Sequence, residues 1–324
     1  MVIGDEMKKV LIITEQYDPM ADILIGELRR RDQTYIRWNL DNFPLTSSLT
    51  YRISASGLGG LLTSDGRTVD LRDIRSVWCR IFRPDGFPQN LSPDERRFAQ
   101  IEAEIALYAL PTVTEWRWIN HPHSQRVASS KPAQLFTARQ LGLEIPRTVI
   151  SNDPDEIRAF CASCGPQVIY KASSQSMDLD PGKAIFTDEV TVRELQNLDL
   201  IKHSPGIFQE LVTKAYEIRA TVIDKKIFGV KIRSQDKEET KLDWRKASLD
   251  IEYEAIDLAK DLEEKILIFM KKFGLIYSSM DFIVTPDGRY IFLESNPGGQ
   301  YMWAEAATGL PITAALADAL TTNG

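Results

Sequence analysis

The pattern of apolar and polar positions predicts an α/β chain. A buried-strand pattern at Lys8–Thr14, followed by helical spacing of apolar residues at Asp22–Arg31, predicts a βα unit at the start. Residues 51–62 alternate, carry three glycines and precede a Ser-Asp-Gly turn, which predicts a hairpin. A strand at Ser76–Phe82 and a helix from about Ser92 to Leu110 complete this irregular first part.

Changes in the pattern divide the chain into three expected domains, at residues 1–118, 119–205 and 206–324. The middle domain reads as a small α/β unit, with a helix at Pro154–Cys164 and a strand at Val168–Ser173. The last domain reads as a mostly antiparallel sheet with helices. Its expected elements are strands at 206–212, 217–223, 226–232, 278–284 and 289–295 and a long helix at Tyr253–Phe273.

Composition and charge narrow the class of protein. The 324 residues are 43% hydrophobic and 26% charged, as in folded globular proteins. A net charge of −7 argues against a sequence-independent grip on nucleic acid. No apolar run approaches the ~20 residues that cross a bilayer, and the first residues do not read as a signal peptide, so we expect a cytoplasmic protein without a membrane partner.

The chain has three cysteines, an odd number that fits a reduced compartment better than a disulfide framework. Cys161 and Cys164 have CxxC spacing, and His121 and His123 could complete a zinc site. Nothing in the sequence brings these segments together. The pattern therefore favours a plain pair of thiols at a helix end.

A tight turn at Pro286–Gly288 joins two predicted strands and places three oxygen-bearing side chains at one end of a hairpin. Asp281 lies near the start of the first strand, and Glu294 and Asn296 lie at the end of the second with one residue between them. These ligand types suit Mg²⁺. Polar residues at a solvated hairpin end are the alternative, and the trio alone does not decide between them.

The surrounding residues supply a resemblance. Pro297–Gln300, followed by YMWAEAATGLPI, resembles the carboxyl-terminal signature of the ATP-grasp superfamily. Upstream, the order NxP…KxxQLxxAxxLGLxxPxT from Asn120 to Thr148 is similar to the start of its central domain. The resemblance implies an ATP-grasp fold of three domains that holds ATP between two antiparallel sheets, with Mg²⁺. No GxxxxGK[ST] and no GxGxxG after a strand competes with it.

The resemblance also implies a set of nucleotide-binding residues. Lys131 and Lys171 match the family's two phosphate-binding lysines, and lysine suits that task because its charge imposes no fixed plane. Phe208–Val212 resembles the hinge strand that faces the adenine, and Glu217 stands where an acidic residue accepts from the ribose. The full implied set is Lys131, Lys171, Gln209, Glu210, Val212, Glu217 and Lys231.

Arginines are the candidates for holding a carboxylate or an acyl phosphate, because their planar fork matches both groups. Arg219, Arg233 and Arg245 are the expected catalytic donors, although surface ion pairs are an alternative for each. Ligases of the D-alanine-D-alanine type have an arginine two residues before the first metal-binding aspartate, where this chain has Ser279. The arginine that holds the phosphate should therefore come from another segment, which favours Arg219 or Arg245.

The run KAYEIRATVIDKKIFGVKIRSQ…KLDWRKAS resembles ATP-grasp ribosomal-peptide maturases of the microviridin, or graspetide, type. Such enzymes phosphorylate Asp or Glu side chains of a precursor peptide and join them to Ser, Thr or Lys side chains as macrocyclic esters or amides. The resemblance implies a precursor peptide as partner, whose leader would dock near Asp188, Glu189 and Glu194 in the segment Asp188–Asp199; an ordinary solvated helix is the alternative for this segment. A homodimer is a further expectation. The alternatives are a ligase that adds amino acids to a peptide or protein, and a nucleotide-binding module or kinase.

Overall fold

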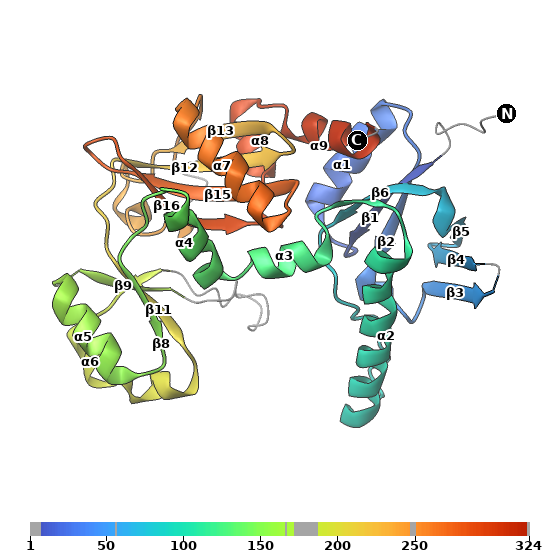
Figure 1. Cartoon of the computed structure of the whole chain (residues 1–324), viewed down its shortest axis with the longest axis horizontal. Coiled ribbons are helices and arrows are strands. Elements are labelled where there is room, and N and C mark those ends of the chain that lie inside the picture. Colours follow the sequence, from blue (N-terminus) through green and yellow to red (C-terminus); the bar gives the residue numbers. More distant parts are fainter. Residues whose placement is uncertain (1–7, 56, 166, 172–186, 247–250, 323–324) are drawn as a thin grey trace.

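The computed structural model describes residues 8–55, 57–165, 167–171, 187–246 and 251–322 (Figure 1). Its amino-terminal unit is built on a parallel sheet with the strand order β2-β1-β6-β7. The strands are β1 (Lys9–Thr14), β2 (Tyr35–Asn39), β6 (Ile74–Cys79) and β7 (Arg117–Ile119). The predicted βα start is thus confirmed. The expected boundary at residue 118 falls within β7.

Helices cover both faces of this sheet because alternate residues of β1 point to opposite sides. Val10 and Ile12 pack with α1 and α9, whereas Leu11 and Ile13 pack with α2. The helices are α1 (Pro19–Arg30), α2 (Pro93–Val113) and α9 (Ile312–Thr321). A Ser92–Glu95 capping box and Pro93 in the first turn start α2 where the sequence predicts it.

A small antiparallel sheet, β3-β4-β5, lies beside α2, where the sequence predicts a hairpin. Its strands are β3 (Ser48–Ser54), β4 (Gly57–Ser64) and β5 (Arg67–Asp70). Tyr51 of β3 donates a hydrogen bond of 2.8 Å to the carbonyl of Ala106. This contact ties the small sheet to α2.

The middle unit is a four-stranded antiparallel sheet in the order β10-β9-β11-β8. It comprises β8 (Thr148–Ser151), β9 (Val168–Lys171), β10 (Asp188–Glu189), β11 (Gly206–Glu210), α5 (Pro154–Cys164) and α6 (Val192–Gln196). Lys171 ends β9, and residues 172 and 173 of the expected strand lie outside the described residues.

The carboxyl-terminal unit is a five-stranded antiparallel sheet in the order β14-β13-β12-β15-β16. Its strands are β12 (Tyr216–Ile223), β13 (Lys226–Ile232), β14 (Tyr253–Ile256), β15 (Tyr277–Val284) and β16 (Tyr290–Asn296). The helices of this half are α3 (Pro122–Ala128), α4 (Lys131–Gln140), α7 (Lys260–Phe273) and α8 (Met302–Thr308). The apolar face of α7 packs on one face of the sheet.

One element differs from its prediction. The helix expected at Tyr253–Phe273 begins only at Lys260, because Tyr253–Ile256 pairs with the edge of β13 as β14. The backbone groups of β13 at that edge thereby gain partners, which helical residues would not supply. The helix ends at Gly274, whose φ of 63° favours glycine.

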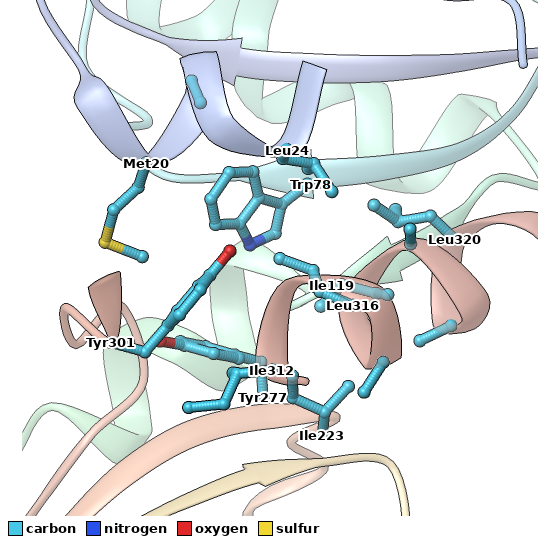
Figure 2. Close-up of a cluster of buried hydrophobic side chains, with 14 of the residues drawn as sticks. Met20, Leu24, Trp78, Ile119, Ile223, Tyr277, Tyr301, Ile312, Leu316 and Leu320 are labelled. Atoms are coloured by element: carbon cyan, nitrogen blue, oxygen red, sulfur yellow. The ribbon is translucent and has the colours of Figure 1, made fainter. Parts of the chain in front are cut away.

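An apolar cluster joins the amino-terminal and carboxyl-terminal units (Figure 2). Met20 and Leu24 of α1 and Trp78 of β6 meet Tyr277 and Tyr301 from the other side. In addition, the buried Asn120 side chain donates to the carbonyls of Tyr277 and Pro297 and accepts from two backbone amides. The two units are therefore held together next to the Asp281–Gln300 hairpin. Among the described residues, no helix is both long and apolar enough to span a membrane.

Candidate active site

Charged side chains from three adjacent strands form one row across the carboxyl-terminal sheet. Arg219 of β12 pairs in register with Asp281 of β15, and Asp281 pairs with Glu294 of β16. Side chains directly opposite each other in an antiparallel pair lie on the same face. Arg219 Nε is 3.0 Å from Asp281 Oδ1, and the two side chains are only 9% and 13% exposed. The row is therefore a largely desolvated charge cluster.

A β-bulge brings Glu294 into this row. Phe282 pairs with Phe292, but the next pair is Asp281 with Glu294, so Leu293 is an extra residue in β16. Regular pairing would place Leu293 opposite Asp281 and turn Glu294 to the face covered by α7. The convergence expected from the hairpin thus depends on the bulge.

Two more residues complete the cluster around Glu294. Asn296 donates from Nδ2 to Glu294 Oε1 at 3.0 Å and lies 3.4 Å from Asp281 Oδ2. Lys131, the first residue of α4, has its Nζ 3.2 Å from Glu294 Oε2. One turn later, the buried Gln134 amide accepts from the Ser295 N–H and donates to the Ser295 carbonyl. Helix α4 therefore holds the strand segment that carries Glu294 and Asn296.

The electrostatics of the two carboxylates fit a bound cation. Burial raises the pKa of Asp281, and the charge of Glu294 adds to that effect against the pull of Arg219. For Glu294, burial is outweighed by Lys131, by the Asn296 hydrogen bond and by Lys171, which lower its pKa. Two buried carboxylates and an amide are hard oxygen donors, and a divalent cation would relieve their repulsion. Asp281, Glu294 and Asn296 therefore suit Mg²⁺.

Two tryptophans enclose the guanidinium of Arg219. Its carbon lies 5.7 Å from the ring of Trp244 and 5.8 Å from the ring of Trp303. Although Nε lies close to Asp281, this buried nitrogen has no hydrogen-bond partner within the described part of the chain. A buried donor without a partner is costly unless a ligand accepts from it. Arg219, on the strand next to that of Ser279, therefore presents a buried donor beside the cluster.

Lys171 and Glu217 lie near the same cluster. Burial lowers the pKa of Lys171 to about 8, with Glu294 and Glu217 opposing and Lys131 and Lys214 adding to the decrease. Glu217 is 2.7 Å from Lys214 Nζ, and both side chains are buried. This side of the cluster therefore contains three lysines with few solvent contacts, a composition suited to anionic phosphates.

Arg245 stands on a loop beside the cluster. Its Nε donates to Asp243 Oδ1 at 2.8 Å, and Asp243 also accepts from the Thr187 amide. Burial notwithstanding, the Arg245 guanidinium lowers the pKa of Asp243 to about 2. The charges of Asp281 and Glu294 contribute to a raised pKa of Arg245, after its hydrogen bond to Asp243. Arg245 is therefore oriented by Asp243 and interacts electrostatically with Asp281 and Glu294.

The predicted hinge residues lie on β11 and just after it. Gln209 is buried and donates to the Thr148 hydroxyl, and Glu210 accepts from the Arg147 amide. These side chains stabilise the small sheet. The Val212 amide has no acceptor among the residues described, so it is open to a ligand.

Lys231 and Arg233 lie apart from the charge cluster in this structure. Lys231 pairs with Ile218, whose side chain packs under α7 on the other face of the sheet. Lys231 and Arg233 both bind Glu254, with Arg233 Nε 2.6 Å from its Oε1. The period of two along a strand separates them from Glu217 and Arg219.

The acidic segment proposed for the leader is not one helix. Asp188 and Glu189 form β10, and a new helix, α6, begins at Val192. Glu194 closes a capping box with Thr191, and Asp188 binds Lys246 at 3.1 Å. Glu189 is exposed. Two of the three carboxylates thus have partners within the protein.

The cysteines and histidines weighed for zinc lie in different surroundings. Cys161 packs in the core of the middle unit, and His121 starts α3 against the Trp118 ring. Over the described ranges, no three His, Cys, Asp or Glu side chains form a cluster that could hold a metal.

Sequence reasoning missed Lys214, Trp244 and Trp303 as parts of the site. Lys214 stands three residues before Glu217, and the tryptophans lie in the LDWRK and YMW runs. Gln134 was recognised only as part of a motif. Their positions near motif residues are the signal that could have indicated them.

The chain is similar to proteins of known structure and family. The MvdD pre-ATP-grasp domain family matches residues 9–126. Macrocyclase MdnC of Microcystis aeruginosa MRC, solved with its precursor peptide MdnA, is 31% identical over 97% of this chain and 100% of its own, with a TM-score of 0.87. This chain belongs to the ATP-grasp macrocyclase family of ribosomal-peptide maturases. The resemblance inferred from the motifs is confirmed, as is the ATP-grasp fold.

Two other solved structures are similar to this chain, one in sequence and fold and the other in fold alone. A RiPP-associated ATP-grasp ligase of Chryseobacterium gregarium, in complex with ADP and a leader and core peptide, is 28% identical over 97% of this chain and 96% of its own, with a TM-score of 0.87. D-alanyl-alanine synthetase A of Vibrio cholerae O1 biovar eltor, 13% identical over 98% of both chains with a TM-score of 0.58, shares the fold. No curated protein sequence matches the chain. Members of the family are ATP-dependent ligases, and this chain is one of them.

Proposed function

We propose that this ligase activates side-chain carboxylates of a precursor peptide as acyl phosphates and closes them onto hydroxyls or amines as macrocycles. The observation that carries the proposal is the row Arg219–Asp281–Glu294, with Lys131 at its end. This row supports the proposal because it combines two buried carboxylates with fixed cationic side chains in one desolvated cluster. Phosphoryl transfer depends mainly on such positioning and charge stabilisation.

Lys131 and Lys171 are the proposed phosphate ligands. In the free enzyme, Lys131 is held by Glu294, and Lys171 is largely desolvated. Asp281, Glu294 and Asn296 would hold Mg²⁺, which neutralises charge on the phosphates when bound. The lysines then turn from the carboxylates to the phosphate oxygens.

The remaining nucleotide contacts are proposed for residues on β11, just after it, and on β12. The open amide of Val212, just after β11, would donate to the adenine edge. Glu217, held by Lys214, would accept from the ribose hydroxyls. Gln209 and Glu210 act by fixing β11 and its neighbouring strand, since their side chains are already used.

Arg219 and Arg245 are the proposed donors to the reacting carboxylate and its phosphate. Arg219 has a buried N–H without an acceptor, and Arg245 is half exposed on an oriented loop. The substrate carboxylate attacks the γ-phosphorus with loss of ADP. A hydroxyl or amine of the peptide then attacks the acyl carbon and releases phosphate. Both arginines can stabilise the charge that develops on these oxygens.

The precursor's leader is proposed to contact the exposed edge at Asp188 and Glu189 in the middle unit. Glu189 is free to bind a basic residue, whereas Asp188 would have to exchange Lys246 for it. Because Lys246 follows Arg245 directly, releasing Lys246 from Asp188 would change the loop that carries Arg245.

Mass spectrometry tests the proposed function. The enzyme is incubated with ATP, Mg²⁺ and a precursor peptide encoded beside its gene, and we expect the peptide to lose one water mass per ring while ADP forms. Glu294→Gln should abolish this loss. Glu144→Gln removes a half-exposed carboxylate that binds Arg289 and serves as the matched control with wild-type turnover.

Two outcomes would contradict the proposal. A gain of mass by whole amino-acid residues would assign the enzyme to peptide extension. A stable phosphate on a hydroxyl of the peptide would assign it to kinase chemistry.

A further inference from the structure

Arg80 connects the amino-terminal sheet to the turn that follows the candidate metal ligand Asn296. In this turn the Gly299 amide donates to the Asn296 carbonyl at 2.9 Å. Arg80, directly after β6, donates from Nη1 to the Gly298 carbonyl at 2.6 Å. Arg80 and Gly298 are 218 positions apart in the chain, so this hydrogen bond joins the two units within the turn itself.

The guanidinium of Arg80 is held in place by its own surroundings. Its Nε is 3.1 Å from Asp18 Oδ2, and the two side chains are only 11% and 6% exposed. Asp18 also accepts from the Thr14 hydroxyl and from the Met20 amide. Burial alone would raise the pKa of Asp18, but the Arg80 charge and these hydrogen bonds lower it overall. The Arg80 guanidinium carbon lies 5.4 Å from the centre of the Trp78 ring. Arg80 is therefore a charged donor with a fixed position.

The two neighbouring carbonyls of the turn are occupied in the same way. The Pro297 carbonyl accepts from Asn120 at 2.9 Å. The Gly299 carbonyl accepts from the hydroxyl of Tyr277, whose ring lies in the apolar cluster between the units (Figure 2). Of the three donors only Arg80 is charged, and hydrogen bonds from charged donors are roughly twice as strong as neutral ones. The Arg80 contact therefore contributes most to fixing the turn.

The turn cannot shift without moving the proposed metal ligand. A Cβ on Gly299 would lie 2.7 Å from Ser279 Cβ and 3.1 Å from Asn296 Cβ, so the backbone packs directly against these two residues. Ser279 and Asn296 also pair in register across β15 and β16. Because Asn296 is the first residue of the turn, a displaced turn would move its amide away from Asp281 and Glu294.

We propose that Arg80 is a positioning residue for the metal site. By holding the Gly298 carbonyl, it fixes the turn and thereby keeps the Asn296 amide beside the two carboxylates. This inference rests on the proposed function, because it takes Asn296 as a ligand of Mg²⁺. Loss of a residue that orients a metal ligand typically lowers metal affinity by ~10- to 100-fold. Since Arg80 acts through the backbone of the turn, the lower end of that range is expected.

Mn²⁺ binding in the presence of ADP tests the proposal without turnover, with the free ion measured by electron paramagnetic resonance. Arg80→Lys keeps the charge but loses the fork that joins Asp18 to Gly298, so the Mn²⁺ dissociation constant should rise about tenfold. Hydrogen–deuterium exchange at the Gly299 amide should become faster in the same variant. Arg80→Met combined with Asp18→Asn leaves no unpaired charge in the interior. This double variant should show both changes even if Arg80→Lys does not fold.

Arg31→Met is the matched control. Arg31 also joins the two units through one carboxylate and one carbonyl, at 2.6 Å from Asp318 and 3.1 Å from the Ala314 carbonyl, but it contacts α9 instead of the turn. The variant should lower the free energy of unfolding. It should leave Mn²⁺ affinity and exchange at the Gly299 amide as in the wild type.

Three results would overturn the proposal. The first is unchanged Mn²⁺ affinity in the Arg80 variants, and the second is an equal loss of affinity in Arg31→Met, which would indicate general loosening between the units. The third is wild-type Mn²⁺ affinity in Asn296→Ala, which would also remove Asn296 from the proposed metal site. If Asn296→Ala loses affinity and the Arg80 variants do not, the metal site stands and only the role of Arg80 is wrong.

Discussion

Arg219 and Asp281 lie opposite each other on β12 and β15, with 3.0 Å between Nε and Oδ1, yet Nε–H forms no hydrogen bond within the described part of the chain. The arginine is thus held beside the carboxylate that we propose as a metal ligand, by charge and by its two tryptophans. Its buried donor remains available. This relationship distinguishes the site from one in which an arginine two residues before the aspartate supplies the clamp.

Replacing Arg219 should separate charge from geometry. Arg219→Lys keeps the positive charge but loses the planar fork, so we expect kcat for macrocycle formation to fall about 100-fold. Arg219→Ala also leaves Asp281 without its partner and should lower the free energy of unfolding by about 3 kcal/mol. Turnover assays and urea unfolding measure the two effects. Wild-type kcat in Arg219→Lys would rule out the proposed clamp.

Gln134 should act on the metal site through Ser295. Gln134→Leu leaves the backbone N–H and carbonyl of Ser295 without their partner and should cost about 3 kcal/mol in unfolding experiments. Because Glu294 and Asn296 flank Ser295, the Mg²⁺ concentration for half-maximal activity should also rise. Gln140→Leu, on the same helix, removes only an exposed contact to Lys272 and should change neither quantity. If Gln134→Leu lowers the free energy of unfolding but leaves the Mg²⁺ dependence unchanged, Gln134 stabilises the fold without positioning Glu294 and Asn296.

ATP binding should depend on pH through Lys171. Its pKa is about 8 in the free enzyme, below the ordinary value of 10.5. The lysine is therefore charged below pH 8 and loses its charge as pH rises through that value, so ATP affinity should fall above pH 8. Bound phosphates favour the charged form, and binding near pH 8.5 should take up protons. Calorimetry in buffers of different ionisation enthalpy measures the uptake, which Lys171→Met should abolish.

The same lysine should affect stability with a defined sign. Between pH 8 and about 10.4 the unfolded chain binds more protons at this group than the folded chain does. Its destabilising contribution is therefore full below pH 8 and is relieved as pH rises through that window. In Lys171→Met this part of the pH dependence of unfolding should be missing.

The tryptophans should influence catalysis through Arg219. Trp303→Leu removes one ring from the guanidinium, and a desolvated cation–π contact contributes roughly 1–2 kcal/mol, so kcat should fall about tenfold. The KM for ATP should stay unchanged, because the nucleotide contacts are elsewhere. Trp303→Phe keeps an aromatic face and should recover most of the loss. Equal kcat values for the Leu and Phe variants would contradict this role.

The accuracy of the sequence predictions differed with the distance over which each structure is determined. The start of α2 at Ser92, the tight turn at Pro286–Gly288 and the buried run of β1 are local, and they form where the sequence predicts them. Tyr253–Ile256 precedes α7 in the chain but forms an edge strand, because it pairs with the open edge of β13. Lys231 and Arg233 lie away from the charge cluster because alternation along β13 places them on the face away from Glu217.

By itself, the sequence determined the ATP-grasp family, the types of side chain in the site and their order along the chain, because motif spacing reflects local backbone requirements. Only the tertiary structure decided which of these residues meet. The extra residue at Leu293 turns Glu294 onto the face of Asp281, and the register of β12 brings Arg219 beside both. Register and bulges are set by pairing between strands that are distant in the chain, so local patterns do not specify them.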